Sequence, residues 1–267
     1  MASRAANKPA RSRKRGRVAV AQHAATSVPT PRFFLVDALR GVAIALMFAY
    51  HFSFDLNYFG LIHVDFYHNP FWLDLRALIV SLFLVLVGVS LVLANRRGVN
   101  LRAALPRLYR LLGAAVLVSL GSYALFPASM IFFGVLHFIF VASLLGLLFL
   151  RLRWTNLALG VLLVLVGLTV QHPWFDQAWL QWFGLMTHKP ITEDYVPLLP
   201  WFGVVLVGIF LGRHLFSGAT LPALARWQPG GSVARLLAFA GRHSLLLYLL
   251  HQPVFLGLLY MVARLKA

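Results

Sequence analysis

The sequence predicts an all-α polytopic membrane helical bundle with about seven transmembrane helices. Of its 267 residues, 60% are hydrophobic and 12% are charged, and that charged fraction is about half of what an ordinary soluble domain carries. The mean hydropathy is +0.79. Apolar runs recur along the whole chain, and none alternates polar and apolar residues as a membrane β-strand would. Because irregular backbone cannot face lipid, these runs are predicted to be helices.

Seven apolar runs approach or reach the length of about 20 residues that a transmembrane helix needs. The first follows Arg32, and the last ends close to the C-terminus. The fifth and sixth are the shortest or have the least distinct ends. In order, the predicted spans are 34–54, 75–95, 108–126, 131–150, 155–171, 198–213 and 244–264.

The segment 1–31 differs in composition from the rest of the chain. It holds seven of the lysines and arginines together with alanine, serine and proline. Such a segment cannot bury a core, so we predict a disordered basic tail, followed by a bundle over 32–267. The tail could touch anionic lipid headgroups, or it could only be a charge that keeps this end in the cytoplasm.

The positive charges predict an orientation in the membrane. With the N-terminus in the cytoplasm, twenty of the 24 lysines and arginines fall on the cytoplasmic side, as the positive-inside rule requires. Six of the seven acidic residues fall on the other side, mostly in two long loops, 55–74 and 172–197. The net charge of +17 is thereby explained without a nucleic-acid partner. The absence of cysteine excludes disulfides and thiolate chemistry.

Histidines inside the apolar runs are candidate functional residues, because an ionisable group within a bilayer is costly. His51 lies four residues before Asp55, on one helix face, so the carboxylate could orient the imidazole. His137 and His251 lie deeper in their spans, and Tyr248 precedes His251 by three residues. The three histidines could line one cavity. A single membrane histidine, however, often only forms an interhelical hydrogen bond.

Arg40 follows Asp37 by three residues at the start of the first span, which favours an ion pair. Its role could be a phosphate contact at the cytoplasmic face or only a topology charge. In the sixth span, Gly208 and Gly212 have the GxxxG spacing that allows close helix packing.

Several motifs, in order over about 32–265, resemble the catalytic-domain family of heparan-alpha-glucosaminide N-acetyltransferase, including its short bacterial members. The last of these motifs contains a Tyr-x-x-His pattern that other membrane acyltransferases share. The motifs are Val36-Asp-Ala-Leu-Arg40-Gly41, Tyr50-His51-Phe-Ser-Phe-Asp55, Phe133-Gly-Val-Leu-His137, Asp194-Tyr-Val-Pro-Leu-Leu-Pro-Trp201-Phe-Gly203 and Ser244-Leu-Leu-Leu-Tyr248-Leu-Leu-His251-Gln252-Pro253.

The resemblance implies an integral-membrane acyltransferase. Acetyl-CoA or another acyl-CoA would be a cosubstrate, with no permanently bound cofactor, and the acceptor would be an extracytoplasmic sugar or glycan. In the lysosomal member, the proposed catalytic histidine lies in the loop after the first conserved span, and His68 is its closest counterpart here. His51 stands where that member has a functional asparagine, so His51 is a rival, with Asp55 as its partner. The candidate substrate- and CoA-binding residues are Arg40, Asp37, His137, Trp201, Tyr248 and His251.

The resemblance also implies the inner membrane of a bacterium, with the lipid bilayer, acyl-CoA and the glycan acceptor as partners; homo-oligomerisation stays open. A transporter or proton relay that uses the membrane histidines is an alternative, although the chain has no evident internal repeat. A b-type haem protein with axial histidines is a less favoured one. The histidine spacing matches no zinc signature, so no metal site is predicted.

Overall fold

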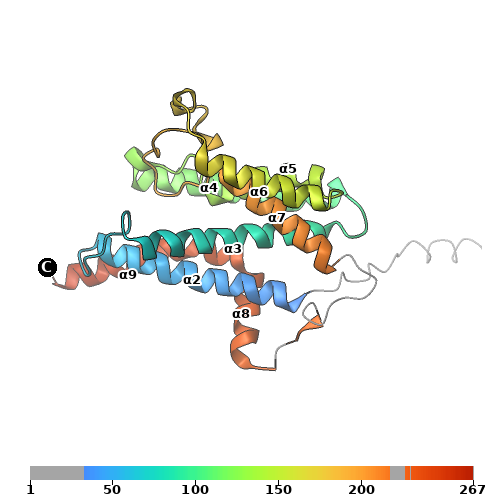
Figure 1. The fold of residues 1–267 in the computed structure, drawn as a ribbon. Coiled ribbons are helices and arrows are strands. Elements are labelled where there is room, and N and C mark those ends of the chain that lie inside the picture. The colour runs from blue at the N-terminus through green and yellow to red at the C-terminus, as the bar shows by residue number, and fades with distance from the viewer. Residues whose placement is uncertain (1–32, 217–225, 229, 267) are drawn as a thin grey trace, which may run out of the picture. The chain divides into compact units, whose positions relative to one another are not determined.

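The protein is an all-helical membrane bundle (Figure 1). The computed structural model describes residues 33–216, 226–228 and 230–266, so the predicted tail 1–31 lies outside the described residues. The described part contains eight α-helices and three short 3-10 turns. They are α2 (Phe34–Tyr58), α3 (Pro70–Ala94), α4 (Leu101–Leu125), η1 (Pro127–Ser129), α5 (Val135–Phe149), α6 (Trp154–Thr169), η2 (Pro173–Asp176), η3 (Gln181–Phe183), α7 (Leu198–Phe216), α8 (Ser232–Arg242) and α9 (Ser244–Lys266).

All seven predicted spans are confirmed as helices. Five of them, α2, α3, α4, α7 and α9, are long and apolar enough to cross a membrane, and α5 and α6 are shorter apolar helices. Figure 1 shows that the bundle has two ends. At the basic end, α2, α4 and α6 begin and α3, α5 and α7 finish; at the loop end lie the connections 59–69, 126–134 and 170–197.

Polar caps set helix starts that hydropathy does not detect. The side chain of Asn69 accepts a hydrogen bond from the backbone N–H of Phe71 at 3.0 Å, so α3 begins at Pro70 rather than near 75. Asn100 likewise accepts from Ala103 at 3.2 Å and starts α4 at Leu101 rather than near 108. Both helices therefore begin several residues before the apolar runs that the sequence analysis selected, and their added turns include charged residues such as Asp74 and Arg102.

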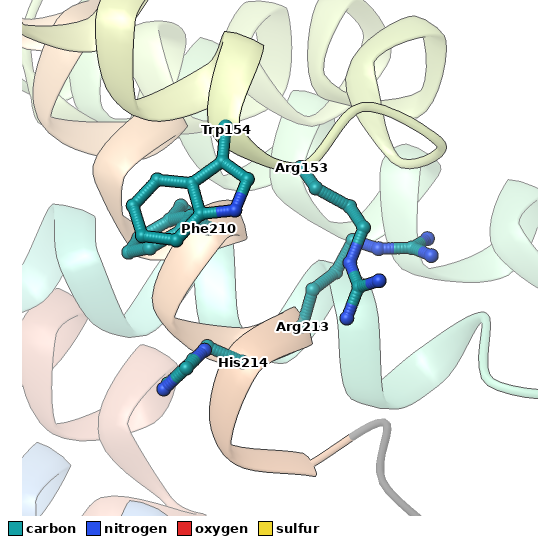
Figure 2. Close-up of a pocket in the computed structure, with 5 residues that line it drawn as sticks. All are labelled: Arg153, Trp154, Phe210, Arg213 and His214. Carbon is teal, nitrogen blue, oxygen red and sulfur yellow. The ribbon is translucent and has the colours of Figure 1, made fainter.

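Two polar side chains tie the turn between α5 and α6 to its neighbours. Asn156 is fully buried, and its amide nitrogen donates to the carbonyl oxygens of Phe149 and Leu152 at 2.9 and 2.8 Å. Arg213, whose side chain Figure 2 shows near the end of α7, donates to the carbonyl of Leu150. Because lipid offers no hydrogen bonds, carbonyls at a helix end need such internal partners.

Glycines allow the closest helix contacts. On α3, a Cβ at Gly88 would overlap the backbone of α7 at Val205 and Gly208, and Gly208 faces Val85 in the same way. The predicted close packing at Gly208 is therefore confirmed. Gly160 of α6 and Gly203 of α7 meet similarly. These contacts place α7 at the centre of the largest core cluster, with Leu206 and Ile209 fully buried.

The sequence did not predict α8, which lies in a segment expected to be only a basic loop. It runs across the basic end of α2, where Gly241 approaches the carbonyl of Asp37 and Gly41 approaches the carbonyl of Leu237. Its other faces are exposed, with Val233 and Leu236 on one flank and Arg235 on another. An amphipathic helix of eleven residues is too short to register as a span.

Replacing Gly41 with alanine is expected to destabilise the bundle by roughly 1–3 kcal/mol, the usual cost of overpacking. The new Cβ would overlap the carbonyl of Leu237, which is backbone and cannot rotate away. Gly113→Ala on α4 is the matched control, because a Cβ there meets nothing within 4 Å. Thermal unfolding in detergent measures both. A Gly41→Ala variant as stable as Gly113→Ala would contradict the close crossing of α2 and α8.

Candidate functional site

The first part of the candidate site lies where α2 and α9 run side by side (Figure 1). The side-chain amide nitrogen of Gln252 lies 3.0 Å from Nδ1 of His51. The rings of His51 and His251 are in edge contact, with centroids 4.9 Å apart. The structure therefore brings together two of the three histidines that the sequence analysis selected.

His251 has one ring nitrogen engaged and one free. Its Nδ1 lies 2.5 Å from the carbonyl oxygen of Tyr248, and since a carbonyl only accepts, Nδ1 carries the hydrogen. The other nitrogen, Nε2, is buried and has no partner among the described residues. In this tautomer, Nε2 presents a lone pair, so His251 can accept a proton or a hydrogen bond there.

Asp55 is not the hydrogen-bond partner of His51 among the described residues, although the sequence spacing suggested it. Gln252, reaching over from α9, occupies that position. Asp55 is 3% exposed and lies beside Gln252. Its Oδ2 and the Oε1 of Gln252 are both buried without a partner in the described part of the chain. Together with Nε2 of His251, three acceptor atoms here lack a donor.

A carboxylate that the sequence analysis named only as the start of a family motif, and not as a site residue, connects α9 to α5. Asp194 lies just before α7, and its Oδ2 accepts a hydrogen bond from the N–H of Val135 at 2.8 Å and from the Tyr248 hydroxyl at 3.2 Å. Burial raises the pKa of Asp194 above its usual range. An acidic residue directly before a long apolar segment was the available signal, but nothing in the sequence indicated its distant partners.

His137 has both ring nitrogens occupied. Its Nδ1 accepts from the N–H of Gly134 at 3.3 Å, and its Nε2 lies 3.0 Å from the hydroxyl of Ser119. None of the described hydrogen bonds or ring contacts joins it to His51 or His251. His137 therefore connects α5 to α4 in this arrangement. Trp201 is partly buried and packs against the core around α7.

A second part of the candidate site is a histidine–carboxylate pair at the loop end. Nδ1 of His68 lies 2.9 Å from Oδ2 of Asp65, and the two side chains are 86% and 54% exposed. Oδ1 of Asp65 accepts the backbone N–H groups of Tyr67 and His68, each at 2.9 Å. These N–H groups, that of Tyr67 first, hold the pKa of Asp65 below its usual range. Asp65 can thus hold the His68 ring in the tautomer whose Nδ1 carries the hydrogen, which leaves Nε2 free to accept a proton.

The basic end carries a network around Arg40. The predicted ion pair with Asp37 is present at 3.2 Å, and the guanidinium also donates to the hydroxyl of Ser90 at 2.7 Å. Arg107, on α4, lies close enough to Arg40 and Arg110 for their charges to interact. The guanidinium group of Arg96 lies 5.5 Å from the centroid of the Phe33 ring. Several cations, from α2, from α4 and from the turn after α3, therefore lie at the basic end.

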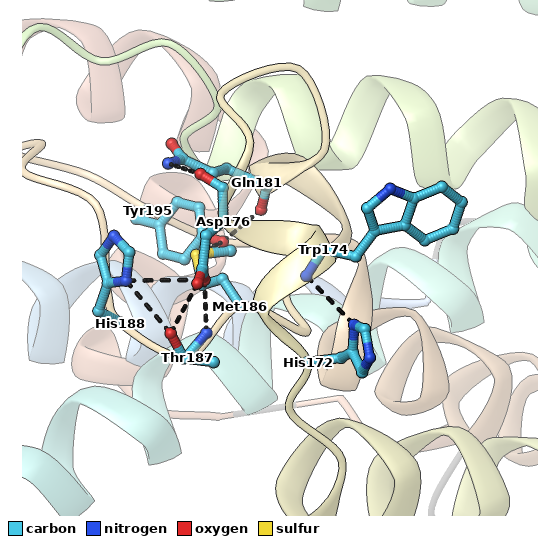
Figure 3. A network of polar contacts seen from close by, with 8 residues as sticks. All are labelled: His172, Trp174, Asp176, Gln181, Met186, Thr187, His188 and Tyr195. Carbon is cyan, nitrogen blue, oxygen red and sulfur yellow. Dashed lines mark hydrogen bonds and ion pairs between the residues drawn. The ribbon is translucent and has the colours of Figure 1, made fainter.

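The long loop 172–197 is tied together by its own polar contacts (Figure 3). Asp176 accepts from both the backbone N–H and the hydroxyl of Thr187 at 2.8 Å, and the N–H contact is the main cause of its lowered pKa. The hydroxyl of Tyr195 donates to the carbonyl of Gln181 at 2.5 Å. His188 lies 3.6 Å from Asp176. The loop thus has a defined internal structure at the end of the bundle that carries His68.

No three His, Asp or Glu side chains gather closely enough to hold a metal ion within the described ranges. The polar groups are distributed over a cation network at the basic end, a buried cluster between α2 and α9, and the Asp65–His68 pair at the loop end. This arrangement offers phosphate contacts at one end and a proton acceptor at the other.

Comparison with known proteins gives one match. The family model described as heparan-alpha-glucosaminide N-acetyltransferase, catalytic, matches residues 32–253. That range covers every helix from α2 to α8 and the part of α9 that carries Tyr248, His251 and Gln252. Searches among curated proteins and solved structures gave no match.

Replacing Asp194 with alanine is expected to cost about 1–3 kcal/mol, because the N–H of Val135 and the hydroxyl of Tyr248 lose their acceptor. The matched control is Glu193→Ala, since Glu193 is exposed and contacts Ser129. Unfolding in detergent provides the comparison, and equal stability of the two variants would refute the role of Asp194.

The raised pKa of Asp194 also predicts a pH dependence. The fold favours the protonated carboxyl, so this stabilisation is present below the ordinary aspartate pKa of about 4 and is lost as pH rises through the raised value. The wild type should therefore lose stability relative to Asp194→Asn over that interval. Unfolding curves whose difference does not change with pH would contradict the assignment.

Proposed function

Because the chain belongs to the heparan-alpha-glucosaminide N-acetyltransferase catalytic family, we propose that it transfers an acetyl or other acyl group from acyl-CoA to a sugar or glycan. Family membership makes it a membrane acyltransferase-like domain. The proposal adds that acyl-CoA binds at the basic end and that the acceptor hydroxyl or amine binds at the loop end. The basic end would face the cytoplasm, as the positive-inside rule favours.

The Asp65–His68 pair is the main observation that supports His68 as the general base. A general base needs a free ring nitrogen that substrate can reach, and Nε2 of His68 meets this requirement on an exposed side chain. Asp65 would stabilise the imidazolium, as the aspartate of a catalytic triad does. Asp65 would thus orient the imidazole of His68, which is the role that the sequence analysis expected of Asp55 toward His51.

The proposed step conserves atoms and charge. The acyl path would bring the thioester from the basic end to the loop end, where the acceptor nitrogen or oxygen attacks its carbonyl while His68 removes the proton of the acceptor. The carbon–sulfur bond then breaks, and the thiolate leaves with the bonding electrons and takes the proton from His68. His51 is the rival base or a transient acyl carrier. In the structure, however, Gln252 presents its amide N–H to Nδ1 of His51, so the His51 hydrogen is on Nε2. That tautomer suits a donor to the thioester oxygen.

The other candidate residues divide between the two ends. Arg40, oriented by Asp37, and the arginines of α4 would hold CoA phosphates. Asp55, Tyr248 and His251 would line the acyl path in the buried cluster. The geometry supports His137 and Trp201 less directly, as parts of the pocket wall, because His137 has both nitrogens bonded and Trp201 packs on the core.

A proton relay is the second candidate function. Asp55, Gln252, His51, His251, Tyr248 and Asp194 form a continuous series of contacts through the apolar bundle. Such a series suits proton movement across a membrane. Substrate-dependent proton uptake by vesicles, without release of CoA, would favour this function over acyl transfer.

The purified protein is expected to release CoA from acetyl-CoA when it is offered an amino sugar. His68→Ala should lower this rate by about 10²- to 10⁴-fold, the usual contribution of a general base. His63→Ala is the matched control, because His63 is an exposed histidine of the same loop. Full activity in both His68→Ala and His51→Ala would eliminate both candidate bases.

A further inference from the structure

A pocket at the basic end shares no lining residue with the Arg40 network, the buried cluster or the Asp65–His68 pair. It lies between the start of α6 and the last turns of α7 and is lined by Arg153, Trp154, Phe210, Arg213 and His214 (Figure 2). Its empty volume is about 240 Å³, including the part that opens to the surface. Neither the family resemblance nor the acyl-transfer scheme assigns a role to these residues.

The pocket gathers positive charge that no acidic residue neutralises. In the described part of the chain, ion pairs join Arg40 to Asp37, His68 to Asp65 and His188 to Asp176, and none involves Arg153 or Arg213. A guanidinium that lacks a carboxylate in this position can take an anion from outside the chain. Arg153 reaches the cavity from the turn before α6, and Arg213 reaches it from α7.

Arg213 is fixed in place but keeps a free donor. One terminal nitrogen donates to the carbonyl of Leu150 and so orients the planar group. Its Nε is buried and has no partner among the described residues. If Arg213 were only a topology charge, it would reach solvent with all its donors. An anchored, half-buried guanidinium with an unused donor can instead bind an acceptor from outside the chain.

The start of α6 adds backbone donors to the same place. Arg153 is the N-cap residue, and since a guanidinium has no acceptor it cannot cap this 16-residue helix. The N–H of Asn156 donates to the carbonyl of Arg153 at 3.0 Å, and the N–H groups before it have no capping side chain. The positive end of the helix dipole points the same way. On the opposite side, the rings of Trp154 and Phe210 are in contact, with centroids 5.0 Å apart, and form an aromatic wall.

We propose that this pocket binds a phosphate group. The bidentate geometry of arginine fits phosphate oxygens, and the helix N-terminus is an anion site. The phosphate has two sources at a membrane surface: the headgroup of an anionic lipid, or the nucleotide part of an acyl-CoA, which rests on the function proposed above. The exposed Trp154 suits either, because tryptophan is common at the membrane interface and its ring can also stack on a base.

The test compares arginines that are close in sequence but differ in position. Arg153→Gln removes one phosphate contact, whereas Arg151→Gln removes an exposed arginine of the same turn that does not line the pocket. Arg213→Lys keeps the charge but loses the planar fork. Each full-length variant is examined in nanodiscs of phosphatidylcholine with and without phosphatidylglycerol, by native mass spectrometry of retained lipid. Direct titration with coenzyme A forms the second arm.

We expect the wild type and Arg151→Gln to bind one of the two probes with the same affinity. The affinity of Arg153→Gln for that probe should be about tenfold lower, because one charge-assisted contact is lost. Retention of phosphatidylglycerol that depends on Arg153 identifies a lipid headgroup, and binding of coenzyme A that depends on Arg153 identifies the nucleotide. Unchanged binding of both probes by folded Arg153→Gln and Arg213→Lys overturns the proposal, as does an equal loss in Arg151→Gln.

Discussion

The structure depends on one constraint: polar groups among apolar helices must find partners within the chain, since lipid supplies none. Asn156 donates to carbonyls at the end of α5, and Asp194 accepts from the first N–H of the same helix. Ser90 takes a donor of Arg40 at the opposite end of the bundle from the loops. Most buried polar groups find such partners, so the few buried atoms that lack one in the described part of the chain mark places where a ligand or a reacting group could be accommodated.

Among the described residues, two of these atoms are the isolated Ser143 Oγ and Asn156 Oδ1, and the other four lie in two regions with different chemistry. Between α2 and α9, the free atoms of Asp55, His251 and Gln252 are acceptors. Near the start of α6, the free atom of Arg213 is a donor beside a second arginine. The acceptors of the first region could bind a group that donates protons, and the donor of the second region could bind an anion. This division agrees with a protein that handles a phosphate-bearing donor at its basic end and moves protons further along the bundle.

The sequence predicted those features that depend on residues close together in the chain. The apolar runs predicted seven spans, the three-residue spacing predicted the Asp37–Arg40 pair, and the motifs pointed to the family that the comparison then matched. It did not predict α8, whose pattern is short and amphipathic. It also missed Gln252 beside His51 and Asp194 beside Tyr248, because these contacts join residues 201 and 54 positions apart. Contacts over such distances follow from helix packing, which leaves no periodic signal in a single sequence.

The central claim is that an acyl group moves from one end of this bundle to the other. The most direct measurement uses proteoliposomes with an amino sugar trapped inside and labelled acetyl-CoA, which does not cross the bilayer, added outside. Transfer through the bundle predicts labelled N-acetyl product inside the vesicles, and its absence when His68 is replaced by alanine. Product that forms only when sugar and acetyl-CoA are on the same side of the membrane would contradict the claim.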